Sequence, residues 1–111
     1  MKYEHTVVGD YLLVQLIGSL DSAGAADVEK QFNVLTGYNV LKVVVDMSQV
    51  DFISSVGIGL LLNHARTFQK KGGQMKFFGL QGKVRKILET TGILKMLSIS
   101  DTKDACIASF K

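Results

Sequence analysis

The chain has little of what covalent or metal-based scaffolds require. Its 111 residues include one cysteine, no proline, no tryptophan and two histidines. Cys106 alone cannot form an internal disulfide, and His5 and His64 are too few for a histidine-rich metal centre. The absence of proline leaves no cis-proline step in folding. We therefore expect a fold held together by packing, without a bound metal.

Long apolar runs are also missing. The N-terminal residues MKYEHT are polar and acidic where a secretory signal needs a continuous apolar stretch. The apolar stretch 52–62 is interrupted by serine and glycine, and it is far shorter than the roughly 20 residues that a membrane span needs. A hydrophobic fraction of 47% is enough for one compact core. We predict a single cytoplasmic domain over residues 1–111, with no membrane segment.

The net charge of +3 is unevenly distributed along the chain. Residues 1–53 carry three lysines and seven acidic residues, whereas residues 54–111 carry ten basic and three acidic ones. The basic residues are spread over several predicted elements, and no aromatic residues alternate with them as a stacking platform for nucleic acid. Solvated faces explain this pattern better than a nucleic-acid partner. A protein that binds nucleic acid or a small anion through its basic residues is nevertheless kept as the least favoured hypothesis. Steep salt dependence of binding would support it.

Short β-prone runs predict the strands of one sheet. Residues 3–8 and 11–17 flank Gly9-Asp10, a turn in which glycine can adopt a positive φ, so they predict an opening hairpin. The nearly continuous apolar run 40–45 predicts a central strand buried on both faces. Shorter strands are predicted at 75–78 and 97–99.

Helical spacing of apolar residues predicts four helices between these strands. The first covers 22–35, with Asp21 or Ser22 as its N-cap and an end near Gly37. The second covers 55–71 and stops at Gly72-Gly73. Shorter helices are predicted at 83–90 and 101–110. The alternation predicts an α/β fold, with a mostly parallel mixed sheet that begins with a hairpin and is flanked by about four helices.

No catalytic constellation is apparent. Gly57-Ile58-Gly59 opens a helix after a strand, but Leu62 occupies the third glycine position of a dinucleotide-binding motif. His64 follows Ser55 by nine residues on the same predicted helix, which separates them by about 14 Å along its axis. They cannot form a nucleophile–base pair directly. We expect no catalytic residue and no cofactor, and Cys106 is most simply a core thiol.

The pair Ser54-Ser55 precedes the second helix and has two interpretations. One serine can be the N-cap of this helix. A serine in the first turn can also carry a phosphate, because the unpaired N–H groups and the positive end of the helix dipole stabilise an anion there. The added charge of about −1.5 to −2 would repel an apolar or acidic partner at an edge flanked by Phe52, Val56 and Ile58.

Residues 43–61, VVVDMSQVDFISSVGIGLL, closely resemble the signature of STAS domains of the bacterial anti-sigma factor antagonist type. That pattern is an apolar strand, Asp-Leu-Ser, two spacers, an aromatic residue, then a small or acidic residue, Ser, any residue and Gly. The likeness continues in Gly18-x-Leu-Asp21, in Gly72-Gly73 and over 84–94. It covers nearly the whole chain.

The resemblance implies a switchable binding module rather than an enzyme. Such a protein, unphosphorylated, binds an anti-sigma factor of the histidine-kinase-like ATPase fold and so frees a sigma factor. That partner is also the serine kinase that phosphorylates and releases it, and a serine phosphatase resets it. ATP and ADP belong to the kinase partner, and free family members are usually monomers. The phosphoacceptor corresponds to Ser55.

The resemblance also assigns roles to residues around this serine. Asp21, Ser54, Ser55, Val56, Gly57 and Ile58 correspond to the partner-binding surface. Asp46 and Gly59 correspond to a structural loop.

Two positions depart from the well-known members. Ser54 stands where they carry aspartate, which makes it a rival acceptor, and Val56 stands where they carry serine or threonine. The departures leave a second hypothesis open, that of a STAS subunit of a signalling scaffold or lipid-transport complex. In that case Ser55 is a cap or contact and is never phosphorylated.

Overall fold

The computed structural model describes residues 1–36 and 42–110, which form one five-stranded sheet in the order β1-β2-β3-β4-β5. The first two strands pair antiparallel, and the three following pairs are parallel. The predicted mixed sheet with an N-terminal hairpin is therefore confirmed. The strands are β1 (Lys2–Val8), β2 (Tyr11–Leu20), β3 (Lys42–Ile53), β4 (Gln74–Phe78) and β5 (Ser98–Ser100).

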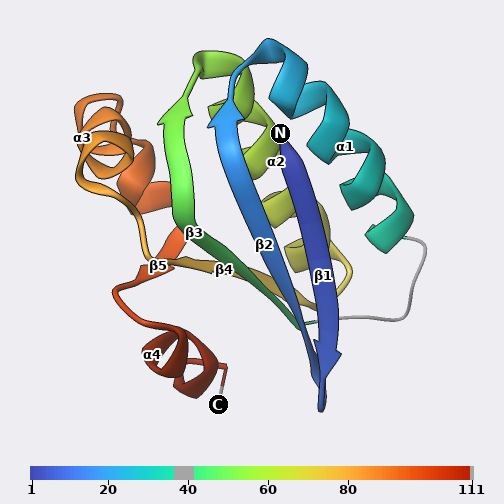
Figure 1. Ribbon diagram of the computed structural model, residues 1–111. Coiled ribbons are helices and arrows are strands. Elements are labelled where there is room, and N and C mark those ends of the chain that lie inside the picture. The colour runs from blue at the N-terminus through green and yellow to red at the C-terminus, as the bar shows by residue number, and fades with distance from the viewer. Residues whose placement is uncertain (37–41, 111) are drawn as a thin grey trace.

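The helices fall into two groups around this sheet. In Figure 1, α2 lies behind β1 and β2 with α1 beside it to the right, whereas α3 and α4 lie apart from them on the left, near β3 to β5. A single 3-10 turn, η1, precedes the last strand and was not predicted. The bounds are α1 (Ser22–Thr36), α2 (Ser55–Lys70), α3 (Gly82–Thr90), η1 (Ile93–Met96) and α4 (Lys103–Ala108).

The main core lies between the sheet and the α1–α2 pair. Along β2 the buried residues alternate, and Leu12 and Val14 stand opposite Val43 and Val45 of β3. Val44, between them, is also fully buried although it faces the other way. Both faces of β3 are therefore covered here, as the apolar run predicts.

Several bounds differ from the sequence prediction. β3 continues to Ile53 although its second half alternates with polar residues, because β2 remains paired with it up to Leu20. Helix α4 is shorter than predicted and begins after Thr102, whose hydroxyl accepts the Ala105 N–H. The predicted helix end near Gly37 lies outside the described residues.

The topology places the beginnings of two helices at one edge of the sheet. β2 and β3 are parallel and end in register, with Leu20 opposite Ile53. Helix α1 starts two residues after Leu20, and α2 starts two residues after Ile53. The Ser54 N–H donates to the Leu20 carbonyl at 3.0 Å and holds the two connections together. In the described part of the chain, none of the helices combines the length and apolarity that crossing a membrane takes.

Candidate functional site

Ser54 is the N-cap of α2. Its backbone is extended, with φ −94° and ψ 171°, and its Oγ accepts the Gly57 N–H at 3.2 Å. The same hydroxyl donates to the Leu20 carbonyl, also at 3.2 Å. Both hydrogen-bonding functions of Ser54 are thus used in joining α2 to the end of β2.

Ser55 is the first residue of α2 and is exposed. Within residues 1–36 and 42–110 its hydroxyl has no hydrogen-bond partner. The first-turn N–H groups and the positive end of the helix dipole lie beside it. The arrangement leaves one serine engaged by the fold and the other open to solvent.

Gly57 allows α2 to approach β2 closely. A Cβ at this position would lie 2.5 Å from the Leu20 carbonyl oxygen and 2.8 Å from Leu20 Cγ. Real side chains do not approach backbone that closely, so glycine is required here. Gly57 is itself buried, and it therefore fixes the geometry of the site rather than offering a side chain to a partner.

The exposure of neighbouring residues corrects one sequence prediction. Val56 is 53% exposed and Phe52 is 46% exposed, so both offer apolar surface on either side of Ser55. Ile58, predicted to bind a partner, is instead part of the core and only 8% exposed. Its place three residues before Leu61 puts it on the buried face of α2.

Asp21 caps α1 in the way that Ser54 caps α2. Its carboxylate accepts the Gly24 N–H at 2.8 Å, and it is exposed at the same edge of the sheet. Of the two caps that the sequence left open, Asp21 is therefore the one used. Ser22, the next residue, lines the same surface groove as Ser55 and Val56.

Asp46 and Gly59, expected in a structural loop, lie in regular elements. Asp46 is within β3, where the pairing with β2 shifts between Gln15 and Ile17. Its carboxylate accepts the Ser48 N–H at 2.9 Å, a local bond that accommodates the bulge. Gly59 lies inside α2, and a Cβ there would meet nothing within 4 Å. The resemblance implied a structural loop at these two positions, and this is wrong, because β3 and α2 continue through them.

His64 closes the groove between α1 and α2, which has a volume of about 370 Å³. The imidazole is 8% exposed and makes an edge-to-face contact with Phe32, at 5.1 Å between ring centres. Its Nδ1 has no hydrogen-bond partner in the described residues. Burial lowers the pKa of His64 from 6.5, and the Glu29 carboxylate partly opposes that change. The spacing from Leu61 to Phe68 could have predicted this buried position.

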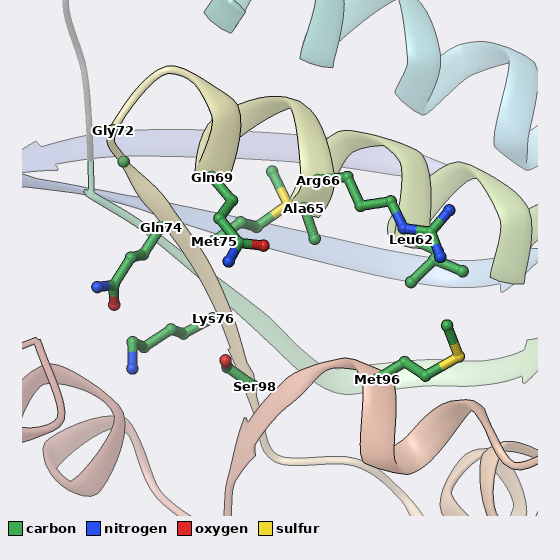
Figure 2. Close-up of a pocket in the computed structure, with 11 residues that line it drawn as sticks. Leu62, Ala65, Arg66, Gln69, Gly72, Gln74, Met75, Lys76, Met96 and Ser98 are labelled. Carbon is green, nitrogen blue, oxygen red and sulfur yellow. The ribbon is translucent and has the colours of Figure 1, made fainter.

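Another hollow, of about 530 Å³, lies toward the other end of α2 (Figure 2). Arg66 and Lys76 line it, but they project in different directions from α2 and β4. Lys76 Nζ is already bound to the Ser109 carbonyl at 3.3 Å. These cations do not converge on one ligand position. The hollow therefore lacks the focused polar groups of a small-molecule site.

A metal-binding cluster and a reactive thiol are also missing from the part of the chain that the structure describes. No group of three His, Cys, Asp or Glu residues in the described ranges could hold a metal ion. Cys106 is fully buried with its Sγ 3.8 Å from the Phe77 carbonyl oxygen, and burial raises the pKa of the thiol. It is a core thiol, as predicted.

Among known protein families, the STAS domain matches residues 2–106 of this chain. The match covers almost the whole chain, including both connections at the candidate site. The chain therefore belongs to the STAS domain family.

Relatives within this family have names that describe anti-sigma factor antagonists. One relative is BtrV of Bordetella bronchiseptica, which is named as a proposed anti-sigma factor antagonist. It is 27% identical over all of this chain and 96% of its own length. The anti-sigma F factor antagonist of Paenibacillus polymyxa is 26% identical over 83% of this chain and 80% of its own.

A solved structure shows the same fold. The anti-sigma factor antagonist SpoIIAA in its unphosphorylated form aligns with a TM-score of 0.79 and 19% identity, over 98% of this chain and 96% of its own. The Bacillus cell fate determinant SpoIIAA in its phosphorylated form aligns with a TM-score of 0.72 and 16% identity, over 99% of this chain and 100% of its own.

Proposed function

We propose that this chain is an anti-sigma factor antagonist controlled by phosphorylation of Ser55. Unphosphorylated, it binds an anti-sigma factor of the histidine-kinase-like ATPase fold and so releases a sigma factor. The names of the relatives support the role. The single observation that carries the switch is the exposed, unpartnered hydroxyl of Ser55 beside a cap already provided by Ser54.

In this proposal the chain is a substrate and binding protein, not an enzyme. The partner transfers the γ-phosphoryl group of ATP to Ser55 Oγ, which loses its proton as the new O–P bond forms and ADP leaves. ATP and its metal are held by the kinase, so this chain needs no cofactor. A serine phosphatase removes the phosphate by hydrolysis. The free protein is a cytoplasmic monomer.

The surroundings of Ser55 explain why a phosphate would release the partner. Phe52 and Val56 offer apolar surface on either side, and a partner that covers them must exclude water. A phosphate of charge about −1.5 to −2 would then have to lose its hydration in the interface. In the free protein the same phosphate is stabilised by the N-terminus of α2. The modification therefore opposes the complex without unfolding the protein.

Ser55 is a better acceptor than Ser54 for a structural reason. The Ser54 hydroxyl is half-buried and engaged at both Gly57 and Leu20, so phosphorylation there would break the cap. The Ser55 hydroxyl can be modified without loss of any hydrogen bond of the fold.

The proposal is tested by the affinity of the purified anti-sigma factor kinase for three forms of the protein. Wild type and Ser55→Ala should bind equally in ADP, whereas Ser55→Asp should bind at least 30-fold more weakly, which corresponds to about 2 kcal/mol. Ser98→Asp is the matched control, since Ser98 is exposed on the edge strand β5 and lines a different hollow from Ser55. Equal affinity of Ser55→Asp and wild type would rule the switch out.

Affinity capture with the same baits separates this function from the alternative. If wild type, Ser55→Ala and Ser55→Asp all retain one assembly that contains no kinase, the chain is a STAS subunit of a scaffold or lipid-transport complex. Ser55 is then only a contact of the first helical turn.

A further inference from the structure

A further hollow lies between the end of β3 and helix α3. It includes Phe52, which precedes Ser55 by three residues. It has a volume of about 490 Å³, and we call it the Phe52 hollow. Phe52, nearly half exposed, forms one wall. Exposed aromatic surface of this size is stabilised when a partner covers it and excludes water. The lining residues are Phe52, Lys83, Lys86, Ile87, Thr90 and Thr91.

The opposite wall is a stripe of α3 that the core does not use. Lys83, Ile87 and Thr90 follow one another at four- and three-residue spacing, so they share one face of the helix. The core face of α3 is instead formed by Val84 and Leu88, both fully buried. α3 thus packs into the protein through one face and turns a second, partly apolar face toward Phe52.

Hydrogen bonds within α3 make this wall less polar. The Thr90 hydroxyl donates to the Lys86 carbonyl at 2.9 Å, and the Thr91 hydroxyl donates to the Ile87 carbonyl at 3.0 Å. The two donors are therefore satisfied inside the helix and do not require a polar ligand.

The charge around the hollow is of one sign. Lys83 and Lys86 are exposed and pair with no acidic group in the described residues, and no carboxylate lines the hollow. Arg85, between them in sequence, differs because it is bound to Asp101 at 3.2 Å. An apolar centre with two unpaired cations at its rim is complementary to an apolar side chain flanked by acidic residues.

We propose that the Phe52 hollow receives an apolar side chain of the anti-sigma factor, and that acidic residues beside that side chain pair with Lys83 and Lys86. The inference rests on the proposed function for the identity of the partner. It deepens that function, because it adds a second point of attachment that is separate from Ser55. The two points are close in sequence, since Phe52 precedes Ser55 by three residues and is itself exposed.

The chemistry of the hollow can be tested with a defined peptide, without the kinase. The probe is the acidic peptide EELLEELLEE, and its counterpart KKLLKKLLKK has the same leucines with opposite charge. Amide NMR shifts should locate the acidic peptide at Phe52, Ile87 and Thr90, with at least tenfold weaker binding of the basic peptide. Shifts centred elsewhere, or equal affinity for both peptides, would overturn the proposal.

Matched variants separate the hollow from general charge effects. Lys83→Glu/Lys86→Glu should reverse the preference between the two peptides. Lys70→Glu/Lys103→Glu changes the net charge equally at exposed positions outside the hollow and should keep the wild-type preference. A similar reversal by both double variants would show that only net charge matters, and the proposal would fail.

The kinase itself then distinguishes failure of the hollow from failure of the switch. We expect Lys83→Glu/Lys86→Glu to bind at least tenfold more weakly, and to raise the KM for phosphorylation of Ser55 while leaving kcat unchanged. If Ser55→Asp abolishes binding but the double variant binds like wild type, the hollow proposal is wrong and the switch stands. If the double variant weakens binding but Ser55→Asp does not, the hollow stands and the switch is wrong.

Discussion

At its N-terminal end α2 is tied to a neighbouring strand by its cap residue, whereas at its C-terminal end it is closed by its own turn. The N-terminal end holds the Leu20 carbonyl through both the N–H and the hydroxyl of Ser54, and Gly57 packs against the same residue. At the other end the Gly73 N–H donates to the Phe68 carbonyl at 2.8 Å, and the Gly72 N–H donates to Gln69. These bonds stay within the helix and form a Schellman-type cap.

The difference shows how one end of a helix becomes a site. Tertiary bonds to β2 fix the first turn of α2 in position, so the exposed Ser55 is presented in a defined orientation. The last turn is stable by itself, and the hollow beside it has polar groups that point in different directions (Figure 2). A pocket alone is therefore a poorer guide to function here than the attachment of the helix.

The largest effect is expected for Gly57→Ala. The added methyl would overlap the Leu20 carbonyl, and backbone cannot move aside as a flexible side chain can. Overpacking of this kind costs roughly 1–3 kcal/mol, and we expect the upper part of that range in the free energy of unfolding. Urea denaturation followed by circular dichroism measures it.

Two other glycines of the same helix and its cap serve as controls. Gly59→Ala meets open space inside α2 and should stabilise by about 0.5–1 kcal/mol. Gly72→Ala also meets open space, but its φ of +83° costs a side chain about 1–2 kcal/mol. If Gly57→Ala were as mild as Gly59→Ala, close approach to β2 would not fix the first turn.

The two serines should differ by a smaller amount. Ser54→Ala removes the cap and its bond to Leu20, so we expect a loss of about 1 kcal/mol. Ser55→Ala removes no bond of the fold and should stay within about 0.5 kcal/mol of wild type. Thermal unfolding of both variants checks this. A larger loss for Ser55→Ala would mean that Ser55, not Ser54, is the cap.

The smallest effect concerns the pH dependence of stability. Burial lowers the pKa of His64 below 6.5, so the unfolded chain binds a proton more readily than the folded protein. With respect to His64, the folded protein therefore has its full stability above about pH 6.5, where His64 is neutral in both states. Its free energy of unfolding decreases as the pH falls from 6.5 toward the lowered pKa of His64 in the folded protein. His64→Phe keeps an aromatic ring against Phe32 and removes the group that binds the proton. Urea midpoints at pH 7.5 and 5.5 should therefore differ less for the variant than for wild type, and an equal difference would contradict the assignment.

Much of the fold was predictable because the sequence patterns are local. The hairpin at Gly9-Asp10, the buried run of β3 and the helix from Ser55 each depend on spacing that a short window contains. The bulge at Asp46 was not predictable, because it is set by the register between β2 and β3. η1 is too short to produce a periodic signal.

The site was predictable in part for the same reason. The Ser54-Ser55 pair marked a cap and a candidate acceptor, but which serine is the cap depended on the Leu20 carbonyl, which is 34 residues from Ser54. Ile58 was assigned to the surface because proximity in sequence to Ser55 does not specify which face of a helix a residue occupies. The Phe52 hollow requires α3, which follows β3 only after α2 and β4.

Mapping the phosphate decides between the two serines. Wild type, Ser54→Ala and Ser55→Ala are incubated with the anti-sigma factor kinase and ATP, and modified residues are identified by tandem mass spectrometry. We predict one phosphate, on Ser55, in wild type and Ser54→Ala, and none in Ser55→Ala. A phosphate on Ser54, or one that persists in Ser55→Ala, would contradict the assignment of Ser54 to the fold and Ser55 to the switch.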